Sequence, residues 1–297
     1  MTHIPVLLKE VIAGFDLKPG NTYLDGTLGS GGHARLVCER FGPSIRIIGI
    51  DRDSDAIIRT EETFKNLPNE HHFVLDEFRN LDNVLSKLHI EKVDGILFDL
   101  GISSPHVDTS GRGFSFMRDE PLLMTMEKDP TEEKMTAYDV VNTWDEDNLE
   151  TIIRYYGEEK YSRRIARNIV SKRDEKPIKT TFELVAIIKE AVPALYRFGK
   201  IHPATRTFQA IRIAVNDELE NLKEGLIKGF DHLLPGGTLA VISFHSLEDR
   251  IVKHFFQEKA KNGDAFLINK KPIIPTEEEI KNNSRSRSSK LRIIKKL

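Results

Sequence analysis

The sequence predicts a doubly wound α/β sheet that is interrupted by an all-helical insertion. Short apolar segments alternate with helical patterns up to Asp99, which is typical of parallel βαβ units. From Asp108 to about Ile201 no convincing strand pattern occurs, and apolar residues recur at helical spacing. An apolar strand pattern returns at residues 238–242. We therefore expect residues 1–107 and 202–297 to form one sheet domain around a helical insertion at residues 108–201.

Composition limits the classes of protein that the chain can belong to. It has 297 residues, of which 39% are hydrophobic, so a real core is expected. The formal net charge is -2, so any surface for nucleic acid must be local. Cys38 is the only cysteine, which excludes a disulfide framework and a cysteine zinc site. No apolar run approaches the length of a membrane span, so we expect a cytoplasmic protein with no membrane partner and no metal.

A strand pattern, a glycine-rich loop and a helix pattern follow one another at residues 22–37. Four glycines fall within the seven residues 26–32, just before His33 begins the helical pattern. Glycines let a backbone approach a ligand closely, and a helix amino end offers free N–H groups. The spacing is not that of a dinucleotide loop, and no Lys-Ser/Thr pair follows to hold a triphosphate. The loop is either a cofactor loop, which we favour, or only a tight turn between strand and helix.

Carboxylates stand at the ends of three predicted strands, at Asp25, Asp51 and Asp99. Ligands in such sheets bind at the carboxyl ends of the strands, so three acids there indicate a site. Asp51 follows Gly31 by 20 residues, where an acid meets ribose hydroxyls. Asp25 would repel a pyrophosphate but suits a cationic amino group. S-adenosylmethionine has such a group and no phosphate, so we predict that it is the cofactor.

Two further side chains have two interpretations each. Phe78 follows the third predicted strand, where it either contacts the adenine or belongs to the core. His245 follows the strand pattern at residues 238–242, and a structural histidine bonded to backbone is favoured over one that faces the pocket.

Local basic segments indicate an RNA-binding surface. Residues 281–297 contain seven Lys/Arg and no acid, and residues 160–179, with Arg163 and Arg167, are also basic. Residues 112–118 place two aromatics between two arginines. Each run alone is as well explained by a solvated face, but together with the arginine–aromatic loop they favour RNA.

With these segments identified, the chain resembles the bacterial RsmH/MraW family, the small-subunit ribosomal RNA (cytosine-N4) methyltransferases. The resemblance covers nearly the whole chain, and its motifs are long and occur in the family's order. They are His3 with residues 5–10, then residues 25–27, 31–33, 50–53, 99–105, 112–118, 156–159, 202–213, 243–252 and 285–292.

The resemblance implies a Rossmann-like class I S-adenosylmethionine-dependent methyltransferase sheet with its helical domain inserted for substrate recognition. It also implies a cofactor site, made by Gly31, Gly32, His33, Asp51, Phe78, Asp99 and His106. The implied partner is small-subunit ribosomal RNA, which we expect to be met within the assembled subunit. The reaction implied is methylation of the N4 amine of a cytosine in the decoding region.

A cytosine amine is a poor nucleophile, because its lone pair is delocalised into the ring. We expect Asp99, the predicted catalytic residue, to orient cofactor and amine, while a backbone carbonyl in residues 101–104 accepts an amine hydrogen. The base would stack on Phe114 or Phe116, with Arg112, Arg163 and Arg167 as further substrate contacts.

Three other functions remain open from the residues. The first is methylation of another amine, in DNA or protein. The second is an RNA-binding or assembly factor that holds the cofactor without turnover. The third, a nicotinamide oxidoreductase, is disfavoured by the glycine spacing.

Overall fold

The computed structural model describes residues 5–102, 107, 110–128, 130–131 and 133–297. The chain forms two compact units, which are considered separately below. The sheet unit comprises Met1–Gly101 and Leu219–Leu297, and the helical unit comprises Ile102–Glu218.

The sheet unit contains a seven-stranded sheet in the order β3-β2-β1-β4-β5-β7-β6. Neighbouring strands from β3 to β5 pair in parallel, while β7 pairs antiparallel with both β5 and β6. The predicted α/β sheet and its antiparallel edge are therefore confirmed. The strands are β1 Thr22–Asp25, β2 Arg46–Asp51, β3 His71–Leu75, β4 Val93–Asp99, β5 Leu233–Ser243, β6 Ala265–Leu267 and β7 Lys290–Lys296.

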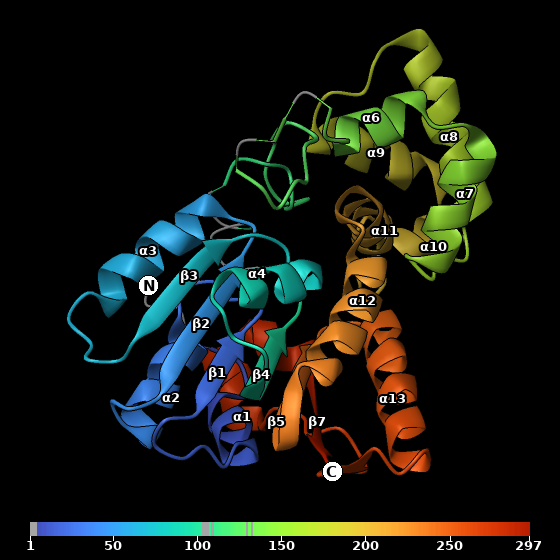
Figure 1. Ribbon diagram of the computed structural model, residues 1–297. Coiled ribbons are helices and arrows are strands. Elements are labelled where there is room, and N and C mark those ends of the chain that lie inside the picture. The colour runs from blue at the N-terminus through green and yellow to red at the C-terminus, as the bar shows by residue number, and fades with distance from the viewer. Residues whose placement is uncertain (1–4, 103–106, 108–109, 129, 132) are drawn as a thin grey trace. The chain divides into compact units, whose positions relative to one another are not determined.

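Helices cover both faces of this sheet (Figure 1). Successive strand residues point to opposite faces, so Tyr23 packs with α1, α2 and α3 while Leu24 packs with α4, α12 and α13. Strands buried on both faces are nearly continuous apolar runs, which explains their pattern in the sequence. The helices of this unit are α1 Leu8–Gly14, α2 Gly32–Phe41, α3 Ser54–Phe64, η1 Phe78–Asn80, α4 Leu81–Lys87, α12 Glu218–Asp231, α13 Ser246–Lys261, α14 Glu277–Asn282 and η2 Ser284–Ser288.

The helical unit has its own apolar core, and its described regular elements are helices. A capping box at Thr180 and Glu183 begins α9, as the sequence predicts. The helix that carries Leu149 is capped by Asp145, whose side chain accepts from the Asn148 N–H at 2.7 Å. The helices are α6 Ala137–Thr143, α7 Glu146–Tyr155, α8 Ser162–Glu175, α9 Thr181–Ala191, α10 Ala194–Arg197 and α11 Thr205–Asn216.

The structure corrects one predicted element and the predicted boundaries. Apolar residues recur at helical spacing from about His202 to Leu226, which predicts a single long helix, but α11 and α12 are separate helices. Asp217 between them has φ 49°, a left-handed conformation that ends a helix. Phe208 and its neighbours on α11 belong to the helical unit's core. The units consequently meet at 101/102 and 218/219, instead of at 107/108 and 201/202.

Cys38 is buried in α2 as a core residue, and burial raises the pKa of its thiol to about 11. Among the described residues, no helix combines the length and the apolar character that crossing a membrane requires.

Gly225 in α12 offers a test of the packing behind the sheet. A Cβ at this position would lie 2.4 Å from Cδ2 of Phe78. Alanine favours helix by about 1 kcal/mol over glycine, but overpacking a filled core costs about 1–3 kcal/mol. We therefore expect Gly225→Ala to lower the free energy of unfolding in urea, while Ser86→Ala on exposed α4 surface leaves it unchanged. A higher urea midpoint for Gly225→Ala would contradict this packing.

Candidate functional site

The three predicted carboxylates lie at one edge of the sheet. Asp25, Asp51 and Asp99 are the last residues of β1, β2 and β4, and β1 pairs in parallel with both of its neighbours. The strand ends therefore bring the three side chains to the same edge, as the sequence predicts.

The glycine-rich loop bonds directly to all three of these acidic residues, to Asp25 through the Thr27 N–H at 3.1 Å. The Asp51 carboxylate accepts a hydrogen bond from the Gly29 N–H at 2.7 Å. The Asp99 backbone N–H donates to Thr27 Oγ1 at 2.6 Å. Thr27 was not singled out from the sequence, because nothing in the pattern distinguishes its hydroxyl from that of any loop residue.

Glycine is required at two loop positions by close approach. Gly31 has φ +71°, and a Cβ there would lie 2.6 Å from Thr60 Cγ2. At Gly32, where α2 begins, a Cβ would lie 2.3 Å from Cγ of Pro5. A side chain at either position would clash with these neighbours and displace the loop, together with the backbone N–H groups at the start of α2.

His33 links α2 to the end of β4. Its Nε2 lies 3.0 Å from the carbonyl oxygen of Val6, which can only accept, so Nε2 carries the hydrogen. Its Nδ1 lies 3.6 Å from Asp99 Oδ2. A second proton on the His33 ring would be carried by Nδ1 and would therefore face the Asp99 carboxylate.

Burial makes Asp25 an unusual acid. Its side chain is 2% exposed, and this desolvation raises its pKa to about 7. The Thr27 N–H donates to its Oδ1 at 3.1 Å and opposes the shift, whereas the charge of Asp51 adds to it. At neutral pH this carboxyl is poised between its neutral and charged forms, and a nearby cation would ionise it.

Asp99 shows the same tendency more strongly. Burial raises its pKa well above the usual value, and the charges of Asp25 and Glu248 raise it further. Its Oδ1 is buried and has no hydrogen-bond partner among the described residues. A buried polar atom without a partner is costly, and at the carboxyl edge of a sheet it indicates a place for a ligand's donor or positive charge.

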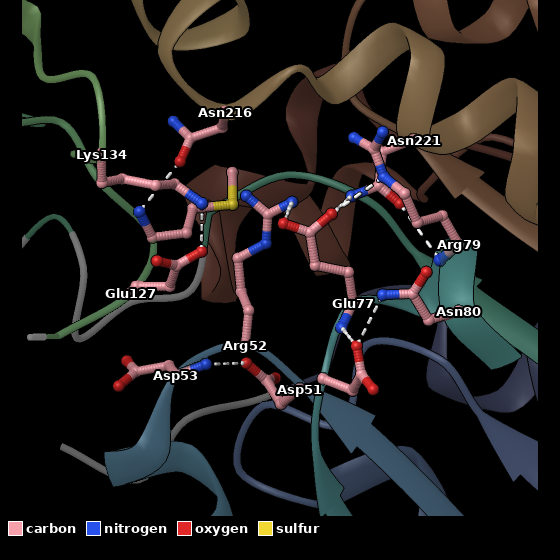
Figure 2. Close-up of polar contacts among 12 residues, drawn as sticks. Asp51, Arg52, Asp53, Glu77, Arg79, Asn80, Glu127, Lys134, Asn216 and Asn221 are labelled. Atoms are coloured by element: carbon pink, nitrogen blue, oxygen red, sulfur yellow. Dashed lines mark hydrogen bonds and ion pairs between the residues drawn. The ribbon is translucent and has the colours of Figure 1, made fainter. Parts of the chain in front are cut away.

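An ion-pair network that was not predicted lies beside Asp51 (Figure 2). Glu77 Oε2 lies 2.9 Å from Arg79 Nε in an ion pair and accepts a hydrogen bond from the Asn221 side chain at 3.0 Å, while Oε1 lies 3.4 Å from Arg52. The network joins the ends of β2 and β3 to α12. Figure 2 also draws contacts within the helical unit, such as the ion pair of Glu127 with Lys134.

The position of Phe78 fits both of its interpretations, a contact with the adenine and a place in the core. It is half-buried, and its ring centroid lies 4.8 Å from that of Phe98. It therefore packs on the core and also keeps exposed ring surface. His106 lies outside the described residues.

Comparison with known proteins assigns the family. The MraW methylase family model matches residues 1–297. The chain belongs to the MraW methylase family.

Curated relatives of the chain agree with this assignment. A protein of Brevibacillus brevis named "Ribosomal RNA small subunit methyltransferase H" is 44% identical, and the match covers 99% of this chain and 98% of the relative. A protein of Persephonella marina with the same name is 47% identical over 99% of each chain. A crystal structure titled a putative rRNA-methylase from Clostridium thermocellum covers both chains fully, but at TM-score 0.49 and 13% identity it carries no argument.

An MraW methylase takes its methyl group from S-adenosyl-L-methionine, and the residues at this edge fit that cofactor. The unpartnered Asp99 oxygen and the easily ionised Asp25 suit a ligand with positive charge. Close neighbours require glycine at positions 31 and 32, so this part of the loop has no side chains that could block a ligand. We continue to assign Asp51 to the ribose and Phe78 to the adenine as proposals.

The substrate residues predicted in the helical unit separate into buried and exposed groups. Arg112 and Phe114 are each 7% exposed, and the Arg112 guanidinium donates to the Met126 carbonyl at 2.8 Å. Both side chains are therefore buried in this structure, and their contact with substrate stays a prediction. Phe116 is half-buried and stacks on His202, with ring centroids 4.6 Å apart.

Arg163 and Arg167 remain candidates for contact with substrate. Both lie exposed on α8, and Arg167 lies 3.5 Å from Glu146 in an ion pair that solvent screens.

His245 is structural, as favoured from the sequence. It is the residue before α13, and its Nδ1 accepts from the Glu248 N–H at 3.4 Å. Glu248 accepts in return from the backbone of His245, which completes a capping box.

The raised pKa of Asp25 predicts how stability depends on pH. The pKa of Asp25 is about 7 in the folded protein, whereas an unperturbed aspartate has a pKa of 3.8. The contribution of Asp25 to the free energy of unfolding is therefore full below about pH 4 and is lost as the pH rises through 7. Without the cofactor, we expect the free energy of unfolding of Asp25→Asn to exceed that of wild type by roughly 2–4 kcal/mol at pH 8, and by much less at pH 4.

Urea titrations across this pH range measure the effect. Asp16→Asn, which alters an exposed carboxylate before β1, is the control and should leave the difference from wild type small at every pH. Parallel curves for Asp25→Asn and wild type would show that Asp25 is an ordinary acid.

Proposed function

We propose that this protein transfers a methyl group from S-adenosyl-L-methionine to the N4 amine of a cytosine in the decoding region of small-subunit ribosomal RNA. The observation that carries the proposal is the buried, unpartnered oxygen of Asp99 at the carboxylate-lined edge of the sheet. The two relatives named for the small-subunit ribosomal RNA support this choice of substrate.

When bound, S-adenosylmethionine supplies an electrophilic methyl group on a positively charged sulfur. An amine that takes up a methyl group must lose one proton, which a group at this edge of the sheet would accept. We expected a backbone carbonyl in residues 101–104 to accept the amine hydrogen, but residues 103 and 104 lie outside the described part of the chain. We assign the proton to Asp99 instead, because a carboxyl with a raised pKa is a stronger base than an ordinary aspartate. His33, with Nδ1 3.6 Å from Asp99, holds that carboxylate in place.

A base in folded RNA is stacked or paired, so it must be exposed before it can react, at a cost of a few kcal/mol. We assign substrate recognition to the helical unit, with Arg163 and Arg167 on exposed phosphates and Phe116, which is more exposed than Phe114, as the aromatic contact. The substrate is the RNA within the assembled subunit, and the reaction takes place in the cytoplasm.

The function is tested by methyl transfer from labelled S-adenosylmethionine. We expect label in small-subunit RNA of assembled subunits, and none in duplex DNA or in ribosomal proteins. Mass analysis of nucleosides then identifies N4-methylated cytosine. Label in protein or DNA alone would reassign the substrate, and cofactor binding without any transfer would make the protein a non-catalytic factor.

Asp99→Asn tests the role of the carboxylate. The substitution keeps the shape but removes both the negative charge and the base, so we expect the single-turnover rate at saturating cofactor to fall about 100-fold or more. Cofactor affinity is measured separately by calorimetry, and Asp16→Asn is the matched control. A near-normal rate for Asp99→Asn would remove Asp99 from the chemistry.

A further inference from the structure

A second cavity lies within the sheet unit, beyond the carboxyl end of β5. Its volume is about 370 Å³, which is within the range of ligand pockets. Its walls come from the residues after β5, the segment that leads into α14, and the end of η2 with the start of β7. We call it the β5-end pocket, and its lining includes Phe244, Ser246, Ile274, Arg287, Ser289 and Lys290.

The pocket is next to the methyl-donor site but distinct from it. Asp99 at the end of β4 lies opposite Ile242 of β5, two residues before Phe244. Phe244 packs over the chain that follows Asp99, since a Cβ on Gly101 would lie 3.1 Å from Phe244 Cδ2. A ligand in this pocket would therefore lie one strand away from the reacting carboxylate.

The pocket has a positive lining. Arg287 is exposed and has no hydrogen bond or ion pair within the described part of the chain. Lys290 and Arg292 share one carboxylate, that of Asp249, at 3.1 and 2.7 Å. Burial raises the pKa of Asp249, but hydrogen bonds from Arg292 and Lys290 outweigh it and hold that pKa below its usual value.

The acids near the pocket do not line it. Glu248 lies behind the wall, where its carboxylate accepts from the backbone N–H groups of Phe244 and His245 at 2.8 and 3.2 Å. Asp249 is committed to its two cations. An anion that enters therefore meets positive charge without a carboxylate beside it.

A buried hydroxyl adds a second observation. Ser289 lines the pocket with a side chain that is 1% exposed, and its Oγ has no hydrogen-bond partner among the described residues. Ser246 begins α13, a 16-residue helix whose amino end also faces the pocket lining. Hydroxyls and helix amino ends are common partners of phosphate.

The remaining wall is apolar. Phe244 is half-buried, Ile274 is 65% exposed, and Pro275 lies between Ile274 and α14. An aromatic ring and aliphatic side chains opposite a guanidinium suit a ligand with a flat apolar face and a phosphate, which is the chemistry of a nucleotide.

We propose that the β5-end pocket holds one nucleotide of the single-stranded RNA substrate. The phosphate lies against Arg287 and the Ser289 hydroxyl, and the base lies against Phe244 and Ile274. This inference rests on the proposed function, and it extends RNA contact to the sheet unit, beside the donor site.

Arg287→Ala tests the inference in the full-length protein. The binding of a fluorescent single-stranded RNA is measured by anisotropy at several salt concentrations, without cofactor, so that turnover is not needed. We expect affinity to fall about tenfold near 0.1 M salt, and the slope of log affinity against log salt to shrink by about 0.7. Lys281→Ala, an exposed basic residue of the same segment outside the lining, should change neither slope nor cofactor affinity.

Cytidine monophosphate and inorganic phosphate distinguish the possible sources of the phosphate. We expect cytidine monophosphate to compete with RNA for wild type and much less for Arg287→Ala, and inorganic phosphate to compete weakly. Equal RNA affinity and slope for Arg287→Ala and Lys281→Ala would overturn the inference, and strong competition by inorganic phosphate in that case would make this a site for free anions.

The two proposals fail differently. A wild-type protein that transfers no methyl group to RNA would end the proposed function, while the anisotropy measurement would still report on the pocket. A wild-type protein that methylates RNA, with Arg287→Ala indistinguishable from Lys281→Ala, would end only the inference about the pocket.

Discussion

The burial of like charges at one edge of the sheet is the constraint on which the rest of the site depends. Desolvation raises the pKa of both Asp25 and Asp99; the charge of Asp51 raises that of Asp25 further, and the charge of Asp25 raises that of Asp99 further. Such an arrangement destabilises the folded chain unless hydrogen bonds or a cation compensate. The loop supplies part of the compensation through Thr27, and the bare Asp99 oxygen leaves the remainder to a ligand. Local instability at a site is expected where binding must be favourable.

Most of the sheet unit was predictable because its central strands β1, β2, β4 and β5 are largely buried on both faces. An apolar run bounded by turn residues can then be recognised without knowledge of its neighbours. The break between α11 and α12 was not predictable in this way. Apolar residues recur at helical spacing on both sides of Asp217, and one residue in a left-handed conformation leaves little mark on that spacing. Aspartate tolerates this conformation better than most residues, but its presence at one position does not predict that conformation.

The acids of the site were predictable for a similar reason. Their position at strand ends follows from the order of the chain, and parallel strands end at the same edge. The burial of Arg112 and Phe114 was not predictable, because the contacts of their loop come from residues distant in the sequence. Asn216 on α11 accepts from the Met126 N–H and donates to the Met124 carbonyl, which fixes the segment that Arg112 bonds to. The Arg112 guanidinium then covers the Phe114 ring at 5.8 Å instead of facing solvent.

The basic carboxyl segment shows how a charge count from the sequence overstates a binding surface. Arg292 is 9% exposed and is bonded to Asp249, and Lys296 donates to the carbonyls of Phe230 and Leu233 at 2.8 and 2.9 Å. Burial lowers the pKa of Lys296, which is the expected result of using a cation to join β7 to the end of α12 and the start of β5. These charges hold an antiparallel strand in the sheet and are unavailable to RNA. A phosphate can be bound only by the cations of this segment that the fold leaves unpaired. Arg287, in η2 before β7, has no ion-pair partner among the residues that the structure describes.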